Sequence, residues 1–386
     1  MRIVIATDAW HPQINGVVRT YENVVENLQR SGHQVSLITP LDFFTVPCPS
    51  YPSIKLAILP GGGVKNHLRT FNPDAIHIAT EGPIGIATRT WCLKNNVPFT
   101  TSFHTRFPEY IRMRIPVPVD LSYAWFRNFH KHSKRILVPT QSQQRLLQAR
   151  GFARVVVWSR GVDCRLFRPG TGGLLNLRKP VFVYAGRVAV EKNIEAFLSL
   201  NLPGSKLVIG DGPDLNKLRR KHYDAHFVGF KIGRELAEHM ACGDVFVFPS
   251  RTDTFGIVML EAMACGLPVA AFPVTGPVDI VQDGITGILD DDLHRAAMAA
   301  LQLRPGDCVD FAGQHSWQAC ADAFSAYLEP LPGPSAKFRS KGADTHGKDC
   351  IPGSVNGACP PGHQSKYHFS DVSPAPFLDQ SLQHRE

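Results

Sequence analysis

The chain has 386 residues, of which 44% are hydrophobic and 19% are charged, and it contains 32 glycines and 30 prolines. This length and composition exclude fibrous and fully disordered proteins and predict a globular chain of two domains. The formal net charge is +8 at pH 7, but residues 1–165 carry 20 Lys and Arg against 9 Asp and Glu. The basic first half predicts an anionic partner: a nucleotide, an acidic lipid surface or a nucleic acid.

The cysteines and the apolar segments indicate where in the cell the protein is located. The nine cysteines are scattered without metal-binding spacing, which indicates a reducing environment. The amino terminus does not resemble a signal peptide, and no apolar run is long enough to span a bilayer. We therefore expect a cytoplasmic protein that can still bind peripherally to the inner face of the cell membrane.

Short apolar runs alternate with amphipathic stretches, a pattern typical of α/β proteins with parallel sheets. In the first half, a helix is expected at 20–30 and strands at 2–6, 35–38, 75–78, 99–102 and 136–139. After a linker near residue 170 the pattern restarts, with helices at 193–200 and 261–264 and extended segments at 181–185, 207–209, 245–249 and 268–272. Two doubly wound halves would bind a ligand at the carboxyl ends of their strands.

The densest chemical signal lies between Arg251 and Glu261. Asp253 follows a predicted strand, a Phe-Gly pair comes next, and Glu261 stands inside a predicted helix. The unpaired backbone N–H groups at the start of that helix form an anion site that fits a diphosphate, and Glu261 suits ribose hydroxyls. The alternative is that Asp253 only caps the helix and that Glu261 is a solvated or salt-bridged acid.

A second cluster places Arg187 and Lys192 between the end of a strand and the start of a helix. Arg187 can bind a phosphate through two N–H groups, and Lys192 adds a point charge. Together they would stabilise a leaving diphosphate without a metal ion. Two surface cations near a turn are the alternative.

The first half offers weaker candidates. Gly16 lies where a strand meets a helix and allows a phosphate to approach the backbone, and His104 follows a strand at the carboxyl edge of the sheet. A plain turn and a structural histidine are the alternatives. The glycines at 61–63 lack the spacing of a P-loop, and the acids at 290–292 are expected to cap a helix. We predict no metal site.

Aromatic and basic residues mix between Leu121 and Arg135. Such a segment suits a membrane surface or a lipid acceptor. Together with two arginines that precede the segment, the candidates for this contact are Arg112, Arg114, Trp125, Lys131, Lys134 and Arg135. A helix with an aromatic core face and a solvated basic face is at least as good an interpretation. Binding of single-stranded nucleic acid is a poorer third.

Taken together, the motifs resemble the large retaining glycosyltransferase family of GT-B fold whose signature is an acid, seven residues and a Glu. The resemblance covers residues 1–330 and rests on Asn15-Gly16-Val17, His104, Arg160 to Asp163, Gly186-Arg187 with Glu191-Lys192, Gly210 to Pro213, Phe227 to Phe230, and Asp253 to Glu261. The Thr-Asp-Thr-Phe-Gly wording is similar to the branch of GDP-mannose-dependent α-mannosyltransferases and of sulfoquinovosyl and glucuronosyl diacylglycerol synthases. Asp253 stands where much of the wider family has Glu, and 61–63 are glycines where longer side chains are expected.

The resemblance implies a role for each site residue. Arg187 and Lys192 would neutralise the donor diphosphate, Asp253 would contact the hydroxyls of the donor sugar, and His104 would lie near the reacting sugar. The donor site would comprise Gly16 against the phosphate, Glu261 on the ribose, and Phe230, Phe255, Gly256, Ile257 and Val258.

The expected organisation is an acceptor-side domain at 1–168, a donor domain at 169–311, a closing helix at 312–330 that returns to the first domain, and a disordered tail at 331–386. We expect a metal-independent hexosyltransferase without a cofactor, acting from a nucleotide sugar, foremost GDP-mannose, on a lipid or lipid-linked glycan. Transfer from UDP-sulfoquinovose or UDP-glucuronate to diacylglycerol is the runner-up. A binding protein with a decayed site and a sugar-nucleotide epimerase are further alternatives, and no nucleic-acid partner is expected.

Overall fold

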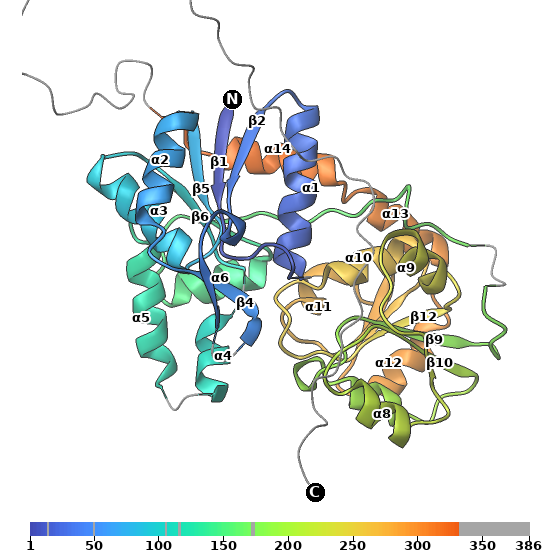
Figure 1. Ribbon diagram of the computed structural model, residues 1–386. Helices are drawn as coiled ribbons and strands as arrows, with labels where there is room; N and C mark the ends of the chain where they lie inside the picture. The colour runs from blue at the N-terminus through green and yellow to red at the C-terminus, as the bar shows by residue number, and fades with distance from the viewer. Residues whose placement is uncertain (14, 49–50, 105, 115–116, 171–173, 332–386) are drawn as a thin grey trace, which may run out of the picture. The chain divides into compact units, whose positions relative to one another are not determined.

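The computed structural model describes residues 1–13, 15–48, 51–104, 106–114, 117–170 and 174–331 (Figure 1). This part of the chain contains two six-stranded sheets and one two-stranded hairpin. All strand pairs in the two large sheets are parallel. Parallel strands need crossover connections, so helices link them and cover both faces.

The first sheet has the order β2-β1-β5-β6-β7-β8. Its strands are β1 (Arg2–Ala6), β2 (Gln34–Ile38), β5 (Ala75–Ile78), β6 (Thr100–Ser102), β7 (Ile136–Val138) and β8 (Val155–Val157). The antiparallel hairpin of β3 (Thr45–Cys48) and β4 (Tyr51–Ala57) follows β2. The helices of this part are α1 (Gly16–Arg30), η1 (Pro40–Asp42), α2 (Gly61–Phe71), α3 (Pro83–Lys94), α4 (Phe107–Arg114), α5 (Val119–His130) and α6 (Gln141–Ala149).

The second sheet has the order β11-β10-β9-β12-β13-β14. Its strands are β9 (Val181–Ala185), β10 (Ser205–Ile209), β11 (His226–Phe227), β12 (Val245–Phe248), β13 (Val269–Ala271) and β14 (Gly287–Leu289). The helices are η2 (Val190–Lys192), α7 (Ile194–Leu198), α8 (Leu215–Lys221), α9 (Gly233–Met240), α10 (Ile257–Ala264), α11 (Pro277–Ile280), α12 (Leu293–Ala300) and α13 (Pro305–Gly313). This is the doubly wound order in which ligands bind where the strand order reverses, here between β9 and β12.

The last described helix, α14 (Trp317–Tyr327), packs beside α1 on the first sheet (Figure 1). The indole Nε1 of Trp158 donates a hydrogen bond of 2.9 Å to the carbonyl of Cys320. The two crossings between the sheets run alongside each other, since Val162 forms a parallel bridge with Ser316. We therefore call β1 to β8 with α1 to α6 and α14 the N-half, and β9 to α13 the C-half.

The predicted strands at 2–6, 75–78 and 181–185 match β1, β5 and β9, and the other predicted strands shift by one or two residues. The helix predicted at 20–30 begins earlier, at Gly16, because the side chain of Asn15 accepts hydrogen bonds from the N–H groups of Val17 and Val18. The helix predicted at 193–200 is wrong in extent. Asn193 adopts φ +53° and separates η2 from the shorter α7.

The acids predicted to cap a helix, at 290–292, include Asp292, which caps α12 by accepting bonds from the N–H groups of His294 and Arg295. The helical segment predicted at 261–264 is the end of α10, which begins at Ile257. The tail predicted to be disordered lies, beyond Leu331, outside the described residues.

Candidate functional site

Two loops meet at the reversal point of the second sheet, one after β9 and one after β12. The first carries Arg187 and Lys192, and the second carries Asp253. Lys192 Nζ lies 2.5 Å from Asp253 Oδ1, and Arg187 Nη1 lies 4.0 Å from Glu191 Oε1. Of the three residues predicted for donor chemistry, the lysine and the aspartate are therefore paired, and Arg187 lies on the same loop as the lysine.

Glycines allow the neighbouring loops to pack backbone against backbone. A Cβ on Gly210 would lie 1.9 Å from the carbonyl oxygen of Gly186, and one on Gly212 would lie 2.3 Å from that of Val188. The hydroxyl of buried Tyr184 donates a hydrogen bond of 2.8 Å to the carbonyl of Arg187. The loop after β10 thus packs against the backbone of the segment that carries Arg187 and Lys192 and fixes its conformation.

The loop after β12 runs into α10. Gly256, at the N-cap, adopts φ +85°, and no described side chain caps the helix. Phe255 is buried in the core of the C-half, while Ile257 and Val258 are half-buried. The first N–H groups of α10 are therefore available to an anion, and the helix dipole favours negative charge there. The interpretation of Asp253 as the cap of this helix is wrong, because its carboxylate pairs with Lys192 instead.

Glu261 lies one turn into α10 with only 2% of its surface exposed. Its Oε1 is 2.6 Å from Nη2 of Arg19, which belongs to α1 in the N-half. Burial raises the pKa of this carboxyl above its ordinary value, and the guanidinium of Arg19 opposes the rise only in part. Among the described residues, Glu261 Oε2 and Asp253 Oδ2 are buried without a hydrogen-bond partner.

Other residues of the N-half also contact the C-half. A Cβ on Gly16 would lie 3.8 Å from Ile257 Cδ1, so the start of α1 faces the start of α10. The hydroxyl of Thr254 donates a hydrogen bond of 2.9 Å to the carbonyl of His104. Gly16 and His104 are therefore placed beside the loop that carries Asp253.

The imidazole of His104 is held in a polar network. Arg160 Nη2 lies 3.0 Å from Nδ1, and the hydroxyl of Tyr21 lies 2.9 Å from Nε2. Because a guanidinium only donates, Nδ1 accepts and Nε2 carries the proton. Burial, and then the charge of Arg160, lower the pKa of His104 well below its usual value, so the ring is neutral. Tyr21 also bonds His77, whose pKa burial lowers to about 3.

Phe230 follows β11 and has 46% of its surface exposed. The carbonyl of its neighbour Gly229 accepts a hydrogen bond of 2.8 Å from the N–H of Gly210. The Phe230 loop is thus joined to the glycine loop after β10.

The candidate membrane residues divide into two groups. On α5, Tyr123, Phe126 and Phe129 are buried, as the aromatic-core interpretation predicts, while Trp125 is exposed. Arg112, Lys131 and Lys134 are exposed, and the side chain of Arg114 lies outside the described residues. Arg135 is instead bound to the carboxyl end of α14, where its Nη1 donates to the carbonyl of Tyr327 and to Glu329, each at 3.1 Å.

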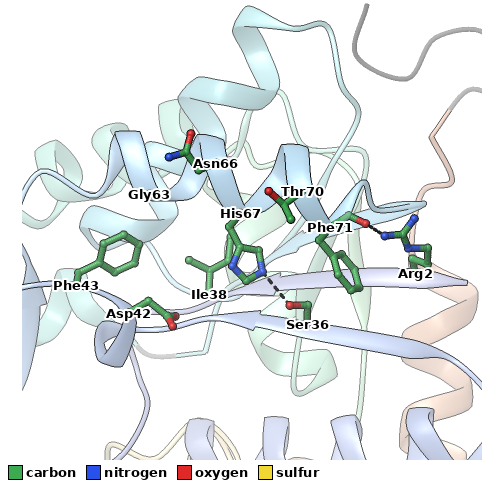
Figure 2. Close-up of a pocket in the computed structure, with 10 residues that line it drawn as sticks. All are labelled: Arg2, Ser36, Ile38, Asp42, Phe43, Gly63, Asn66, His67, Thr70 and Phe71. Atoms are coloured by element: carbon green, nitrogen blue, oxygen red, sulfur yellow. Dashed lines mark hydrogen bonds between the residues drawn. The ribbon is translucent and has the colours of Figure 1, made fainter. Parts of the chain in front are cut away.

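A separate pocket of about 550 Å³ lies between α2 and β2 in the N-half (Figure 2). Figure 2 shows His67 pointing from α2 to Ser36 on β2, with which it forms a hydrogen bond of 2.8 Å, and Phe43 and Phe71 at opposite ends. None of the residues predicted for the site lines this pocket.

The described residues also bear on metal binding and on membrane insertion. They contain no group of three or more His, Cys, Asp and Glu side chains arranged to hold a metal ion. Nor is any helix in this part of the chain long and apolar enough to cross a membrane.

Comparisons with known proteins place these features in a family. Residues 14–166 match the model of glycosyltransferase family 4, and residues 179–304 match that of glycosyl transferases group 1. A GDP-mannose-dependent alpha-mannosyltransferase of Mycobacterium tuberculosis is 32% identical over 317 residues, covering 75% of this chain and 83% of that protein. The chain belongs to the group 1 glycosyltransferases.

Other proteins resemble this glycosyltransferase. The sulfoquinovosyl transferase SQD2 of Arabidopsis thaliana is 32% identical over 310 residues, which cover 72% of this chain and 61% of SQD2. The alpha-monoglucosyldiacylglycerol synthase of Acholeplasma laidlawii is 26% identical over 336 residues, which cover 75% and 84%. The structure of a sucrose-phosphate synthase from Thermosynechococcus elongatus matches with a TM-score of 0.68 at 20% identity, covering 84% of this chain and 97% of that one. The fold of the glycosyltransferase is therefore GT-B.

Sequence reasoning missed three residues that the structure brings to the site of this glycosyltransferase: Arg19, Tyr21 and Thr254. Arg19 stands three positions after Gly16 on the same helix face, a spacing that signals a shared neighbour. Thr254 adjoins Asp253 and was passed over because an uncharged side chain carries no chemical signal of its own.

Proposed function

We propose that this glycosyltransferase moves a hexose from a nucleotide diphosphate sugar, foremost GDP-mannose, to a lipid or lipid-linked glycan, with retention of configuration and without a metal ion. The observation that carries the proposal is the arrangement at the start of α10. The N-terminus of α10 has no side-chain cap. Asp253, three residues before its N-cap Gly256, pairs at 2.5 Å with Lys192, on the loop that also carries Arg187. Helix N–H groups and two cations together stabilise a diphosphate as its negative charge grows.

Each charged group then has a task. Arg187 and one N–H of Lys192 bind phosphate oxygens, while another N–H of Lys192 keeps its bond to Asp253, since an ammonium has three donors. Asp253 Oδ2, which has no partner among the described residues, accepts from a hydroxyl of the donor sugar. The pair thus joins recognition of the sugar to stabilisation of the leaving group.

Retention requires the acceptor hydroxyl to attack the anomeric carbon from the face that the diphosphate leaves. The new carbon–oxygen bond forms as the bond to phosphate breaks, and the hydroxyl proton passes to the departing phosphate oxygen. Both ring nitrogens of His104 are engaged with Arg160 and Tyr21, so the phosphate is the base in this proposal. His104 acts through its carbonyl, which holds Thr254 beside Asp253.

GDP-mannose leads as donor because a relative named for that donor is 32% identical across most of both chains. UDP-sulfoquinovose is the runner-up because SQD2 has the same identity over a similar span. Thermal shift with GDP-mannose, UDP-sulfoquinovose, UDP-glucuronate and UDP-glucose separates them. The true donor at 100 times its dissociation constant stabilises by about 2.7 kcal/mol, and stabilisation by UDP-sulfoquinovose alone would replace the leading assignment.

The chemistry is tested with the donor so identified. Proton NMR of the product reports its anomeric configuration, and turnover in EDTA reports the need for a metal. Inversion or loss of activity in EDTA would contradict the mechanism. Donor binding without transfer to any lipid acceptor would favour the decayed binding protein, and release of an epimerised nucleotide sugar would identify an epimerase.

A lipid acceptor is supported by an apolar surface on the N-half. Leu41, Phe44, Val46, Ile58 and Leu59, around the β3–β4 hairpin, are all exposed, with Phe44 at 90% and Leu59 at 91%. The N–H of Ile58 bonds the carbonyl of Phe44, so these residues adjoin across the hairpin. Apolar side chains gathered on a surface are typical of membrane contacts.

Sedimentation with phosphatidylglycerol vesicles tests this surface against the basic one. Phe44→Ser with Leu59→Ser is expected to reduce binding several-fold, whereas Lys131→Glu with Lys134→Glu is expected to reduce it mainly at low salt. Equal binding of both variants and the unchanged protein would show that neither surface contacts the membrane, and no binding by the unchanged protein would leave a water-soluble acceptor.

A further inference from the structure

Arg19 connects the two halves at the most buried acid of the site. It stands on α1, and its Nη2 lies 2.6 Å from Oε1 of Glu261 on α10. Its side chain is 38% exposed, whereas that of Glu261 is 3% exposed. The pair is therefore enclosed on the glutamate side and open to solvent on the arginine side.

The carboxylate of Glu261 is only half satisfied. Arg19 engages Oε1, while Oε2 is buried and has no hydrogen-bond partner among the described residues. A buried carboxylate oxygen without a donor costs free energy, and such a group in a native protein calls for an explanation such as an absent ligand. Burial raises the pKa of this carboxyl, and Arg19 opposes that rise only in part. The ionised form, which Arg19 favours, accepts hydrogen bonds at both oxygens.

We infer that Arg19 is a positioning residue for the nucleoside of the donor: it holds Glu261 through Oε1 so that Oε2 accepts a hydrogen bond from a ribose hydroxyl. This rests on the proposed function, which places the nucleotide at α10. Arg19 touches the glutamate and not the reacting sugar. A residue of the N-half thereby sets the affinity of a nucleotide held by the C-half.

The local packing supports a fixed arrangement. Gly16, one turn before Arg19, approaches Ile257, one turn before Glu261, so α1 and α10 face each other over two successive turns. A guanidinium on one helix opposite a carboxylate on the other has little freedom to choose another partner. Oε2 is enclosed in this structure, so ribose entry has to shift its cover while the bond to Oε1 keeps the carboxylate aligned.

The test uses ligands that differ only at the ribose. GDP and UDP, and their 2′,3′-dideoxy forms, are titrated by calorimetry into the full-length protein and into Arg19→Met. The unchanged protein is expected to prefer the ribonucleotide of its own base. Arg19→Met is expected to lose on the order of tenfold in affinity for that ribonucleotide, as for loss of a hydrogen bond to a charged group, and to bind the dideoxy form as before.

Three further variants complete the design. Arg19→Lys keeps a donor and is expected to recover part of the ribose preference. Glu261→Gln combined with Arg19→Met is expected to be no worse than Glu261→Gln alone, because both act through one contact. Arg30→Met is the matched control on the same helix, since Arg30 pairs only with exposed Glu26 in the described structure and is expected to change nothing.

The outcomes distinguish failure of the role inferred for Arg19 from failure of the proposed donor site. Equal losses for ribo and dideoxy nucleotides, or a gain in affinity on removing Arg19, would overturn the positioning role. Failure of the unchanged protein to bind either GDP or UDP would overturn the donor site itself. If Arg19→Met does not fold, the ribose preference of Arg19→Lys and of Glu261→Gln decides the matter.

Discussion

Both halves carry a doubly wound sheet, but they use the reversal point in opposite ways. In the N-half, Asp8 follows β1 and accepts hydrogen bonds from the N–H groups of Ile84 and Gly85 at the start of α3, at 2.9 and 3.3 Å. In the C-half, the corresponding loop after β9 presents Arg187 and Lys192, and the start of α10 has no side-chain cap in the described structure. The N-half satisfies its helix terminus with its own carboxylate, and the C-half leaves that place for an anion.

The difference shows what decides whether a sheet edge becomes a binding site. Asp8 is buried, and Thr80 bonds it as well, at 2.8 Å. An internal acid at this position supplies the hydrogen-bond acceptors that a diphosphate would otherwise supply. Removing Asp8 should therefore cost stability, whereas removing the cations of the C-half should cost activity.

The largest effect is expected at Lys192. Lys192→Ala removes a preorganised charge from the leaving group and is expected to lower kcat by on the order of 10²-fold or more. Lys221→Ala, which removes an exposed lysine paired with Glu195, is the control and is expected to leave kcat unchanged. Steady-state turnover with the true donor is the measurement, and an unchanged kcat in Lys192→Ala would remove its role at the diphosphate.

The second prediction concerns the loop packing of the C-half. Gly212→Ala places a Cβ 2.3 Å from the carbonyl oxygen of Val188, so the segment 186–192 has to move. We expect a loss of about 3 kcal/mol in stability together with weaker nucleotide binding. Gly306→Ala, where nothing lies within 4 Å of the added Cβ, is the control. Denaturant unfolding and calorimetry measure the two effects, and a loss of stability with normal binding would show that this loop does not shape the site.

The third prediction is a loss of stability without a loss of nucleotide affinity. Asp8→Ala leaves two helix N–H groups and the Thr80 hydroxyl without their acceptor and is expected to cost about 2 kcal/mol of stability. Nucleotide affinity is expected to be unchanged, because the C-half holds the nucleotide. A marked loss of nucleotide affinity in a folded Asp8→Ala protein would break the contrast between the halves.

The smallest effect is a pH dependence. Burial is the main cause that raises the pKa of Asp8 above its ordinary value of 3.8, so the native state favours the protonated acid. The stability that this raised pKa contributes is full below the pKa of the unfolded state and is lost as the pH rises through the higher native pKa. Asp8→Asn removes this titration. As the pH rises above about 4, the melting temperature of the unchanged protein is therefore expected to fall relative to that of the Asp8→Asn variant. A constant difference between pH 4 and 7 would show that Asp8 does not titrate in this way.

Much of the fold followed from the sequence because buried parallel strands are short apolar runs, such as Val181–Ala185. The site was predicted as a set of side chains at strand ends, and the structure pairs Lys192 with Asp253 there, with Arg187 on the same loop as Lys192. Which charges pair could not be predicted. The partners Lys192 and Asp253 belong to different loops, whose course is set by backbone packing at glycines.

Contacts between the N-half and the C-half were harder still to predict from the sequence. Arg19 and Glu261 are far apart in sequence, and neither helix pattern contains information about the other. The neutral state of His104 depends first on burial and then on the charge of Arg160, which the sequence indicated only as part of the motif Arg160 to Asp163. On α5, by contrast, the spacing of Tyr123, Phe126 and Phe129 by three residues was enough to indicate one buried face.

The return of α14 to the N-half has a consequence for how the protein is made. Trp158, Tyr21 and Ile5 pack against Phe324 and its neighbours in one apolar cluster, so the N-half lacks part of its core until α14 has been synthesised. Every strand and helix of the C-half precedes α14 along the chain. Because the ribosome delivers the chain from its amino end, we expect the half that comes second in sequence to be the first that can complete its fold.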